Sequence, residues 1–347
     1  MQAIFRVDSS LQIGAGHVVR CLALAQVFRN NGLNVRFICR KHSGNLIENI
    51  NFNGFKVYEL EALKKTESSD RLTYSQWLGV TQEQDADDCI NILKLERIDL
   101  FIVDHYAIDS KWHNKIKPFV EKLIVIDDLA NRRLDCDVLI NQNLGVNIDD
   151  YQGKIPENCN FLLGSEYALL RSEFLNLRAK ALEKRKITKK VKNILISVGG
   201  SDMENLTYDI LKKINKDFNI VVVLGSSSPH NEIVQNYAQD KNIEVIINAN
   251  NMADLMLHAD LAIGSSGSTS WERCCLGLPT LLFVVGADQE KISYNLEVLG
   301  AAKVVKDLEV DLNNLSSNIT LWKDMSSKAA NICDGSGSSK VAKLCLL

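Results

Sequence analysis

The sequence lacks the features that would place it among membrane-spanning, nucleic-acid-binding or zinc-ribbon proteins. No apolar run in the 347 residues reaches the roughly 18 residues of a membrane span. The formal net charge of -3 offers no electrostatic basis for binding nucleic acid or an anionic membrane. Nine cysteines occur, but none in C-x-x-C spacing. We therefore expect no nucleic-acid partner and no stable membrane association.

The cysteines and the N-terminus indicate where the protein works. Cys274 and Cys275 are adjacent, so on a helix their thiols would point to different sides, which does not suit a zinc site. Free, reduced and mostly buried thiols are the favoured interpretation. Arg6 and Asp8 interrupt the first apolar run, so we expect no signal peptide. A cytoplasmic protein is predicted.

Length and periodicity predict two doubly wound α/β domains of Rossmann type. A chain of 347 residues exceeds what one compact core usually needs. Strand-like apolar runs alternate with helical segments, which indicates parallel sheets. The runs are Ala3–Val7, Val35–Cys39, Lys56–Leu60, Leu100–Val103, Leu123–Ile126 and Val138–Asn141, then Ile194–Val198, Ile220–Leu224, Glu244–Ile247, Leu261–Gly264, Thr280–Val285 and Ala302–Val305.

The domain boundary is expected within a charged helical stretch. The segment RSEFLNLRAKALEKRKITKKVK is a solvated linker by composition. We place an N-terminal domain at 1–160, a linker helix region at 161–190 and a C-terminal domain at 191–347. The C-terminal domain would include a short final helix from Lys340 to Leu346.

The first cluster with chemical potential is the strand-to-helix turn VDSSLQIGAGHVVR. Gly14 and Gly16 resemble the start of a dinucleotide fingerprint, but Val19 occupies the third glycine position, which disfavours a nicotinamide site. The turn instead places His17 in the first helical turn. There the helix dipole disfavours imidazolium and leaves the ring able to accept a proton. A catalytic base and a histidine that only hydrogen-bonds the loop both fit.

Two further strand ends carry polar residues. Asp104, His105 and Tyr106 follow a buried strand and could contact a ligand, although Asp104 could equally only cap the next turn. Asp127 and Asp128 follow another strand. Paired acids can bind metal, but adjacent side chains usually point apart, so we expect no metal site.

The third cluster is LAIGSSGSTSWERCCLGLP, where a Ser/Gly loop precedes a helix. Small side chains, hydroxyls and free N–H groups at a helix N-terminus suit a phosphate. No lysine follows the last glycine, so this is not a Walker loop. Glu272 comes one helical turn later and could accept hydrogen bonds from a ribose diol. The predicted anion-binding residues are Ser265, Ser266, Gly267, Ser268 and Thr269.

Six stretches together resemble a known enzyme family, the UDP-2,4-diacetamido-2,4,6-trideoxy-β-L-altropyranose hydrolases of pseudaminic acid biosynthesis. They are FRVDSSLQIGAGHVVRCLALA, QWLGVTQEQDA, FIVDHYAID, VIDDLANRRLDCDVLINQNLG, YALLRSEF and SVGGSD. The resemblance covers nearly the whole chain in the family's order. It implies the GT-B fold, close to the glycosyltransferase that makes lipid II.

The resemblance also implies an activity and its residues. The expected reaction is metal-independent hydrolysis of a UDP-sugar at its anomeric carbon with inversion, which releases UDP and the free sugar and needs no cofactor. The family's catalytic base maps onto His17, and the tyrosine lining the sugar site maps onto Tyr106. The Ser/Gly loop and Glu272 take the places that bind diphosphate and uridine. The remaining expected substrate contacts are Asp8, Gly14, Gly16, Arg20, Gly200, Asp288 and Gln289.

Two other functions compete with hydrolysis. A UDP-sugar-dependent glycosyltransferase of the same fold would use His17 to activate an acceptor hydroxyl in place of water. A non-catalytic sugar-nucleotide sensor would keep the third cluster and have no need of His17. For the hydrolase we expect a UDP-sugar and UDP as the only partners and a monomer.

Overall fold

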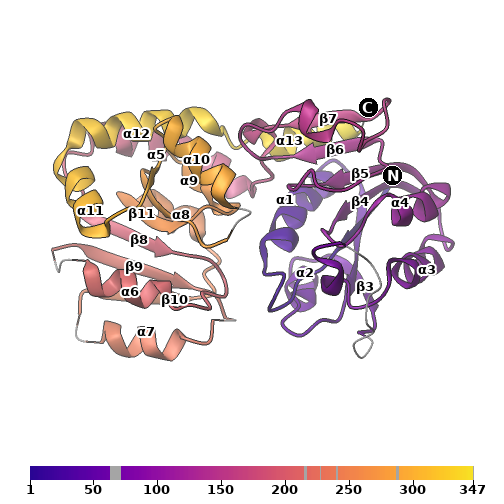
Figure 1. Ribbon diagram of the computed structural model, residues 1–347, viewed down its shortest axis with the longest axis horizontal. Helices are drawn as coiled ribbons and strands as arrows, with labels where there is room; N and C mark the ends of the chain where they lie inside the picture. The colour runs from indigo at the N-terminus through magenta and orange to yellow at the C-terminus, as the bar shows by residue number, and fades with distance from the viewer. Residues whose placement is uncertain (63–71, 215–216, 227, 240, 287–288, 347) are drawn as a thin grey trace. The chain divides into compact units, whose positions relative to one another are not determined.

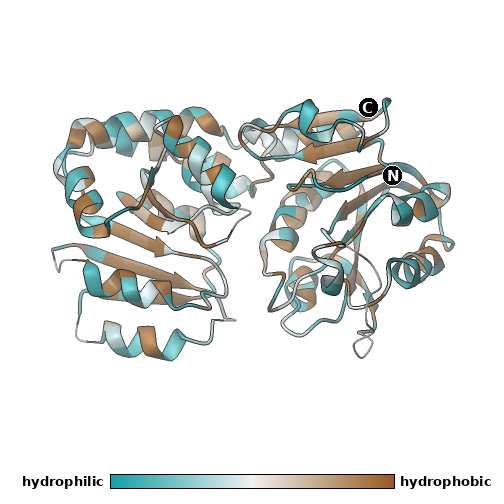
Figure 2. Ribbon diagram, viewed as in Figure 1, coloured by the Kyte–Doolittle hydropathy of each residue, from teal (hydrophilic) through white to brown (hydrophobic). Residues whose placement is uncertain are grey.

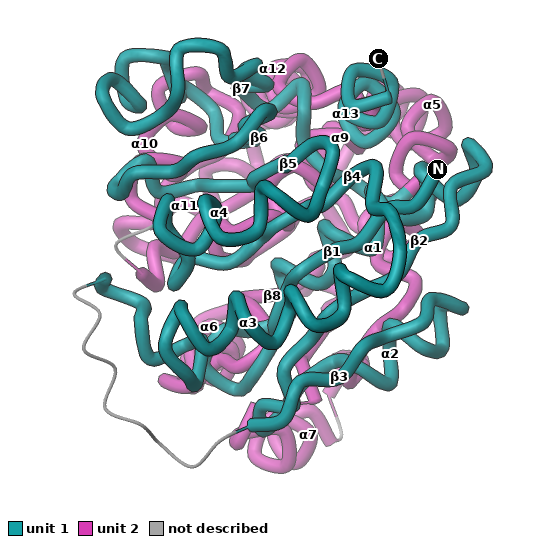
Figure 3. Tube along the Cα trace, turned by 90° about the vertical axis from the view of Figure 1, so that its right-hand side faces the viewer, with its two compact units in different colours: residues 1–171, 337–347 teal, residues 172–336 magenta. Residues whose placement is uncertain are grey.

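The computed structural model describes residues 1–62, 72–214, 217–226, 228–239, 241–286 and 289–346. The chain forms two compact α/β units (Figure 1). Unit 1 comprises residues 1–171 and 337–347, and unit 2 comprises residues 172–336 (Figure 3). The predicted fold class, two doubly wound parallel α/β domains, is confirmed.

Unit 1 is built on a seven-stranded sheet of order β3-β2-β1-β4-β5-β6-β7, in which all the pairings are parallel. Its strands are β1 Gln2–Val7, β2 Asn34–Arg40, β3 Lys56–Leu60, β4 Ile98–Asp104, β5 Val120–Ile126, β6 Val138–Asn141 and β7 Asn160–Leu163. Its helices are α1 Gly16–Asn30, α2 Ile47–Phe52, α3 Gln82–Leu93, α4 Ser110–Ile116 and α13 Gly337–Cys345, with 3-10 turns η1 Ser75–Trp77, η2 Lys117–Phe119, η3 Ile148–Tyr151 and η4 Ser165–Tyr167.

Both faces of this sheet are buried. Successive residues of a strand point to opposite faces, so Ile4 and Phe5 enter different cores. Phe5 packs in a cluster with residues of α1, α2 and α13, whereas Ile4 packs with residues of α3 and α4. Figure 2 shows the strands as hydrophobic along most of their length. The polar residues predicted for the site in this unit accordingly lie at or beyond the carboxyl ends of the strands.

Unit 2 repeats the plan with a six-stranded parallel sheet of order β10-β9-β8-β11-β12-β13. Its strands are β8 Asn193–Ser197, β9 Asn219–Leu224, β10 Ile243–Ile247, β11 Leu261–Ser265, β12 Thr280–Phe283 and β13 Lys303–Val304. Its helices are α5 Ser172–Ile187, α6 Leu206–Lys213, α7 Asn231–Ala238, α8 Met252–His258, α9 Thr269–Cys275, α10 Glu290–Val298, α11 Leu308–Ser317 and α12 Ile319–Ile332.

Each sheet has one point where the strand order reverses. In unit 1 this point lies between β1 and β4, and in unit 2 it lies between β8 and β11. The loops that leave two such strands run to opposite faces of the sheet, which opens a crevice at their carboxyl ends where ligands bind in this class of fold. The turn that carries His17 follows β1, and the Ser/Gly loop follows β11. The topology thus places two of the predicted clusters at these points.

The division of the chain differs from the expected boundaries at the C-terminus. Helix α13 belongs to unit 1, because Val341 and Cys345 are buried in the core that α1 covers and Ser338 Oγ donates to the Leu170 carbonyl (2.9 Å). The segment expected as a linker divides as well, with residues 161–171 in unit 1 and helix α5 in unit 2. The apolar face of an amphipathic helix can pack on either of two similar sheets. The sequence pattern therefore could not predict that α13 packs on unit 1.

Each predicted strand run overlaps a strand of the structure. The structure also has strand β7, which the sequence analysis did not predict. Its four residues, Asn160–Leu163, pair with β6 at the edge of the sheet and are too few to show a period. All nine cysteines are free and buried, as expected. Within the described part of the chain, no helix is both long and apolar enough to cross a membrane.

Candidate active site

The turn after β1 has the geometry that a glycine permits. Ser10 Oγ accepts hydrogen bonds from the N–H groups of Gln12 and Ile13 (3.1 and 3.0 Å), and Gly14 N–H donates to the Ser10 carbonyl (2.9 Å). Gly14 has φ +78°, a left-handed conformation that side chains with a Cβ rarely adopt. The chain then enters α1 at Gly16. This compact turn places His17 in the first turn of the helix, as predicted.

His17 is held by a carboxylate from the neighbouring strand. Its Nδ1 lies 2.6 Å from Asp104 Oδ1, at the carboxyl end of β4. The histidine side chain keeps 10% of its surface exposed, and Asp104 is fully enclosed. Among the described residues no hydrogen-bond partner is found for His17 Nε2, which is not one of the enclosed polar atoms either. The ring is thus anchored on one side and accessible on the other.

Arg20, one helical turn after His17, pairs with the same carboxylate. Its Nε donates to Asp104 Oδ2 (2.6 Å) and its Nη2 donates to Oδ1 (2.7 Å), a bidentate arrangement. Burial by itself would raise the pKa of Asp104, but the charge of Arg20 and the hydrogen bonds from Arg20 and His17 outweigh it and hold the pKa well below the usual range. Asp104 is therefore an ionised acceptor at neutral pH.

The network extends through Arg20 to a second carboxylate. Arg20 Nη1 donates to Asp128 Oδ2 (2.5 Å), and the Tyr106 hydroxyl donates to the same oxygen (2.5 Å). Burial, together with the nearby Asp128 charge, raises the pKa of Tyr106 well above its ordinary value. The phenol is thus neutral and its proton is committed. We call His17, Arg20, Asp104, Tyr106 and Asp128 the His17 cluster.

Aromatic rings adjoin the imidazole. The ring of Tyr106 lies 4.6 Å from that of His17, nearly perpendicular at 80°. Trp77 stacks on Tyr106 (5.8 Å, 23°), and Tyr74 contacts both of these rings (4.5 and 5.5 Å). Tyr74 and Trp77 are only partly buried. His17 therefore adjoins a group of three aromatic rings, a surface suited to the apolar face of a sugar.

Asp8 has a different environment from the one expected of a substrate ligand. Its carboxylate has no exposed surface, accepts two hydrogen bonds from Arg6 (2.6 and 2.8 Å) and accepts a third from the Arg40 backbone N–H (2.7 Å). Burial would raise its pKa, yet the Arg6 charge and the imidazole nitrogens of His105 and His42 close to Asp8 Oδ2 (3.3 and 3.5 Å) hold that pKa well below its usual range. Asp8 therefore joins strands β1 and β2 and is not available to a ligand.

Arg20, an expected substrate contact, lies next to His17. Its guanidinium donors go to Asp104 and Asp128, and its side chain is 6% exposed. It supports the His17 cluster from inside the protein. Sequence reasoning could not see this, because the two carboxylates that it joins are 84 and 108 residues away along the chain.

The adjacent acids Asp127 and Asp128 point into separate networks, as expected for neighbouring residues. Asp127 pairs with Arg132 Nη1 (2.6 Å) and accepts a hydrogen bond from the Tyr151 hydroxyl (2.9 Å). Each of the two carboxylates is thus compensated by an arginine. No group of three or more His, Cys, Asp or Glu side chains suited to a metal ion occurs among the described residues.

In unit 2 the Ser/Gly loop begins where β11 runs close against β8. A Cβ on Gly264 would lie 2.2 Å from the Ser197 carbonyl oxygen, so only glycine fits there. The buried Arg273 donates to the Ser265 carbonyl (2.6 Å) and to Ser270 Oγ (3.0 Å). Burial lowers the pKa of Arg273 to about 10, which leaves the guanidinium charged at neutral pH. A buried positive charge is thus hydrogen-bonded to the backbone at the start of the loop.

The loop is also tied to the segment before α10. Gln289 Oε1 accepts hydrogen bonds from the N–H groups of Ser266 and Val285 (both 3.3 Å), and Ser266 Oγ lies 2.5 Å from Ser293 Oγ. Ser265 and Ser266 are buried, whereas three residues of the loop are partly exposed and available to a ligand: Gly267, Ser268 and Thr269. Asp288, expected to reach the sugar, lies outside the described residues.

The other residues predicted for the nucleotide lie near this loop. Glu272 is in α9 with 7% of its surface exposed. Gly200 is exposed in the turn after β8, the strand that pairs with β11. The structure therefore brings His17, Arg20 and Tyr106 together in unit 1, and places Gly200, Ser265–Thr269, Glu272 and Gln289 at one sheet edge in unit 2.

Sequence reasoning missed part of the site in unit 1. Asp104 was recognised only as a polar residue at a strand end, with turn capping as an alternative, and no contact with His17 was predicted. Trp77 and Tyr74 were not considered as site residues. The signal for Asp104 was its place at the end of β4, the strand next to β1 at the point of order reversal. Using that signal requires the strand order.

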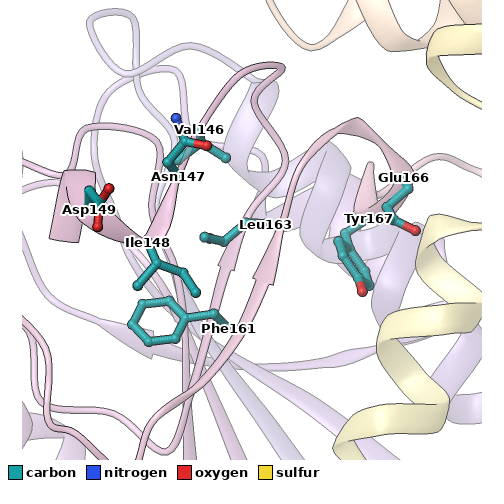
Figure 4. A pocket seen from close by; sticks show the side chains of 8 residues that line it. All are labelled: Val146, Asn147, Ile148, Asp149, Phe161, Leu163, Glu166 and Tyr167. Carbon is teal, nitrogen blue, oxygen red and sulfur yellow. The ribbon is translucent and has the colours of Figure 1, made fainter.

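An open depression of about 450 Å³ lies elsewhere in unit 1, beside the edge strand β7 (Figure 4). Figure 4 shows Ile148 against Phe161, with Glu166 and Tyr167 on the far side. None of the predicted site residues lines it. The lining residues are Val146, Asn147, Ile148, Asp149, Phe161, Leu163, Glu166 and Tyr167.

Comparison with known proteins identifies the family to which this chain is similar. The Glycosyltransferase family 28 C-terminal domain matches residues 172–344, which is unit 2 with most of α13. A UDP-2,4-diacetamido-2,4,6-trideoxy-beta-L-altropyranose hydrolase from Campylobacter jejuni is 32% identical over 271 residues, which cover 77% of this chain and 86% of that protein.

Two other similarities concern more distant or longer proteins. Uncharacterized protein MJ1062 from Methanocaldococcus jannaschii is 30% identical over 81% of this chain, and the chain spans only 55% of that protein's length. The crystal structure of Acinetobacter baumannii MurG aligns with a TM-score of 0.66 over 99% of both chains at 15% sequence identity. At that identity the likeness establishes the fold alone, which is the expected GT-B fold.

Proposed function

Since the chain belongs to the family of UDP-2,4-diacetamido-2,4,6-trideoxy-β-L-altropyranose hydrolases, we propose that it hydrolyses a UDP-linked 2,4-diacetamido-2,4,6-trideoxy sugar at the anomeric carbon. The products are UDP and the free sugar with inverted configuration. The reaction would supply the sugar for pseudaminic acid synthesis. A fold shared with so many activities does not choose among them, so the proposal rests on the site.

The observation that carries the proposal is the state of His17. Asp104 is ionised and only accepts hydrogen bonds, so the 2.6 Å contact requires a proton on His17 Nδ1. In the neutral ring, Nε2 then has a free lone pair. That nitrogen has no protein partner among the described residues and belongs to a side chain that remains partly exposed. A neutral imidazole held in this way can act as a general base toward a water molecule.

The chemistry needs one base and no protonating acid. His17 Nε2 takes a proton from a water molecule while the water oxygen forms a bond to C1 of the sugar. The bond from C1 to the diphosphate oxygen breaks, and UDP leaves with the electron pair. UDP is a good leaving group, unlike the alkoxides for which glycosidases need a second carboxylic acid. Attack on the face opposite to UDP inverts the anomeric carbon.

Each unit carries a cluster suited to one part of the substrate. The rings of Tyr74, Trp77 and Tyr106 would receive the apolar face of the trideoxy sugar, since the Tyr106 hydroxyl is already committed to Asp128. In unit 2 the partly exposed residues Gly267–Thr269 would bind the diphosphate, and Glu272 would accept hydrogen bonds from the ribose. The charge on the buried Arg273 favours an anion at this loop.

A glycosyltransferase remains the second candidate, because the matched domain in unit 2 is named for glycosyltransferases. In that reaction His17 Nε2 would take the proton of an acceptor hydroxyl. The contacts within the His17 cluster do not depend on whether the attacking oxygen belongs to water or to an alcohol. The choice between the two therefore depends on whether an acceptor is required.

A single assay separates these functions. The purified protein is incubated with the UDP-sugar in buffer without any acceptor, and UDP and free sugar are followed by ³¹P and ¹H NMR. The proposed hydrolase releases both products in equal amounts, and the first sugar anomer to appear has the inverted configuration. Release of UDP only after an acceptor alcohol is added would identify a transferase, and binding without turnover would identify a sensor.

A further inference from the structure

We propose that Asp104, held by Arg20, is a positioning residue that fixes the tautomer and the orientation of His17 for base catalysis. This inference rests on the proposed function, because it concerns the same base. It adds a requirement that the base alone does not imply: His17 works only while an ionised carboxylate on β4 holds its other nitrogen. Asp104 acts through His17 and has no contact with substrate.

The geometry decides between two possible tautomers. Arg20 Nη2 lies 3.3 Å from His17 Nδ1, so a hydrogen bond from the guanidinium would require Nδ1 to be an acceptor and would place the proton on Nε2. Asp104 Oδ1 lies 2.6 Å from the same nitrogen. In that tautomer, Nδ1 and Oδ1 would both be acceptors, with no proton between them. The shorter contact to a full negative charge is the stronger of the two. The Nδ1–H tautomer follows, with Nε2 as the accepting atom.

Arg20 makes Asp104 suited to this task. An isolated buried carboxylate would take up a proton and become a donor. The bidentate pair from Arg20 Nε and Nη2 keeps Asp104 charged and prevents its rotation, because both oxygens are engaged. Asp128 pairs with the third guanidinium nitrogen and with the Tyr106 hydroxyl, so the arginine is held too. Each member of the His17 cluster is thereby fixed by at least one other.

A purely structural role for Asp104 predicts a different behaviour. A carboxylate that served only folding would affect the stability of unit 1 and leave the turnover of correctly folded molecules unchanged. A positioning role predicts a loss of turnover per folded molecule, without a matching loss of substrate affinity. It also predicts that the pH dependence of kcat changes when Asp104 loses its charge, because this charge faces His17 directly. The other charged or titratable groups around the ring are Arg20, Tyr106 and, beyond them, Asp128.

The first test needs no substitution in the cluster. The native protein is labelled with ¹⁵N-histidine, and the imidazole nitrogens of His17 are identified by comparison with the His17→Asn variant. At a pH where the ring is neutral, Nδ1 is expected to carry the proton and Nε2 to have the chemical shift of an unprotonated nitrogen. The opposite tautomer, with the proton on Nε2, would overturn the inference whatever the activity of the protein.

The second test uses Asp104→Asn, with Asp99→Asn on the same strand as the matched control. An amide in place of Asp104 removes the negative charge and can present its NH₂ group to His17 Nδ1, which favours the proton on Nε2. We expect kcat to fall by at least about 100-fold, KM to change less than about threefold, and the acidic limb of the remaining activity to move to lower pH. Asp99 lies outside the His17 cluster and accepts a hydrogen bond from the Gln2 N–H, so its variant should keep native kinetics.

The outcomes separate this inference from the proposed function. If the native protein does not release UDP, the proposed function fails, and the NMR result still decides the tautomer. If the native protein is active and His17→Phe is inactive, but folded Asp104→Asn keeps near-native kcat, the positioning role is refuted while the base is retained. Should Asp104→Asn fail to fold, Arg20→Lys is the substitute, because it keeps the charge and loses the bidentate contact. We expect at least a tenfold fall in the kcat of Arg20→Lys, and native kinetics in that variant would refute the positioning role.

Discussion

Replacement of His17 is the sharpest perturbation of the proposed mechanism. His17→Phe keeps an aromatic ring next to Tyr106, where the two rings are 4.6 Å apart, and removes both nitrogens. His17→Asn keeps a donor that can reach Asp104 and removes the accepting Nε2. The two variants therefore lose different structural contacts and share only the loss of the base. Equal inactivity in both would assign the effect to Nε2.

The expected magnitude follows from what each variant removes. Loss of a general base costs roughly 10² to 10⁴ in turnover, which is about 3 to 5 kcal/mol of transition-state stabilisation at about 1.4 kcal/mol per tenfold. The folding cost of His17→Phe is smaller, about 1 to 3 kcal/mol for one charged hydrogen bond, because Asp104 keeps its two bonds from Arg20. Both variants should fold and bind UDP through unit 2.

The assay combines UDP release, UDP affinity by calorimetry and circular dichroism. His258→Phe is the control, since this histidine is exposed in unit 2 and its ring contacts only Asp254 of its own helix among the described contacts. The native pH profile should show one ionisation on its acidic limb, because a protonated imidazole cannot accept a proton from water. A folded His17→Phe variant with near-native turnover would refute the mechanism. Tyr106 would not replace it readily, since its proton is committed to Asp128 and its pKa is raised.

Three further predictions concern the nucleotide, metals and stability. Glu272→Ala should weaken UDP binding by about 1 to 3 kcal/mol through lost hydrogen bonds, whereas Glu309→Ala on the exposed start of α11 should not; unchanged UDP affinity by calorimetry would remove Glu272 from the site. Exhaustive EDTA treatment should leave turnover intact, because Asp127 and Asp128 are each paired with an arginine. Activity lost to EDTA and restored by Mg²⁺ or Mn²⁺ would implicate these residues or Asp288. His113 is buried, and burial with the charges of Arg132 and Lys117 lowers its pKa to about 3. Since the unfolded chain takes up this proton near pH 6.5, the stabilising contribution is complete above that pH and declines by about 1.4 kcal/mol per pH unit as the pH falls toward 3. Urea unfolding between pH 7 and 5 should show a shallower decline for His113→Phe, and an identical slope would contradict the assignment.

The buried strands and the loops that follow them could be predicted from the sequence. Strand runs such as Ala3–Val7 and Leu261–Gly264 are apolar because both faces of a parallel sheet are covered, and this pattern is local. The position of His17 in the first turn of α1 is local as well, since it depends on a glycine turn and the start of a helix. The resemblance to a hydrolase family also lies in the order of short stretches along the chain.

The tertiary structure alone decided which charges face each other. Asp8 and Asp104 lie at the carboxyl ends of neighbouring strands, offset by one residue because Asp104 is paired with Val7, and Asp8 pairs with Arg6 whereas Asp104 holds His17. Strand order and the face of the sheet on which each side chain lies determine this difference. The local sequence pattern does not predict which residues meet on that face. The return of α13 to unit 1 has the same cause, because burial rewards any complementary apolar face without regard to distance along the chain. The sequence by itself therefore determined the turn and the place of His17 in it, whereas only the packing of β1 against β4 determined which carboxylate contacts His17.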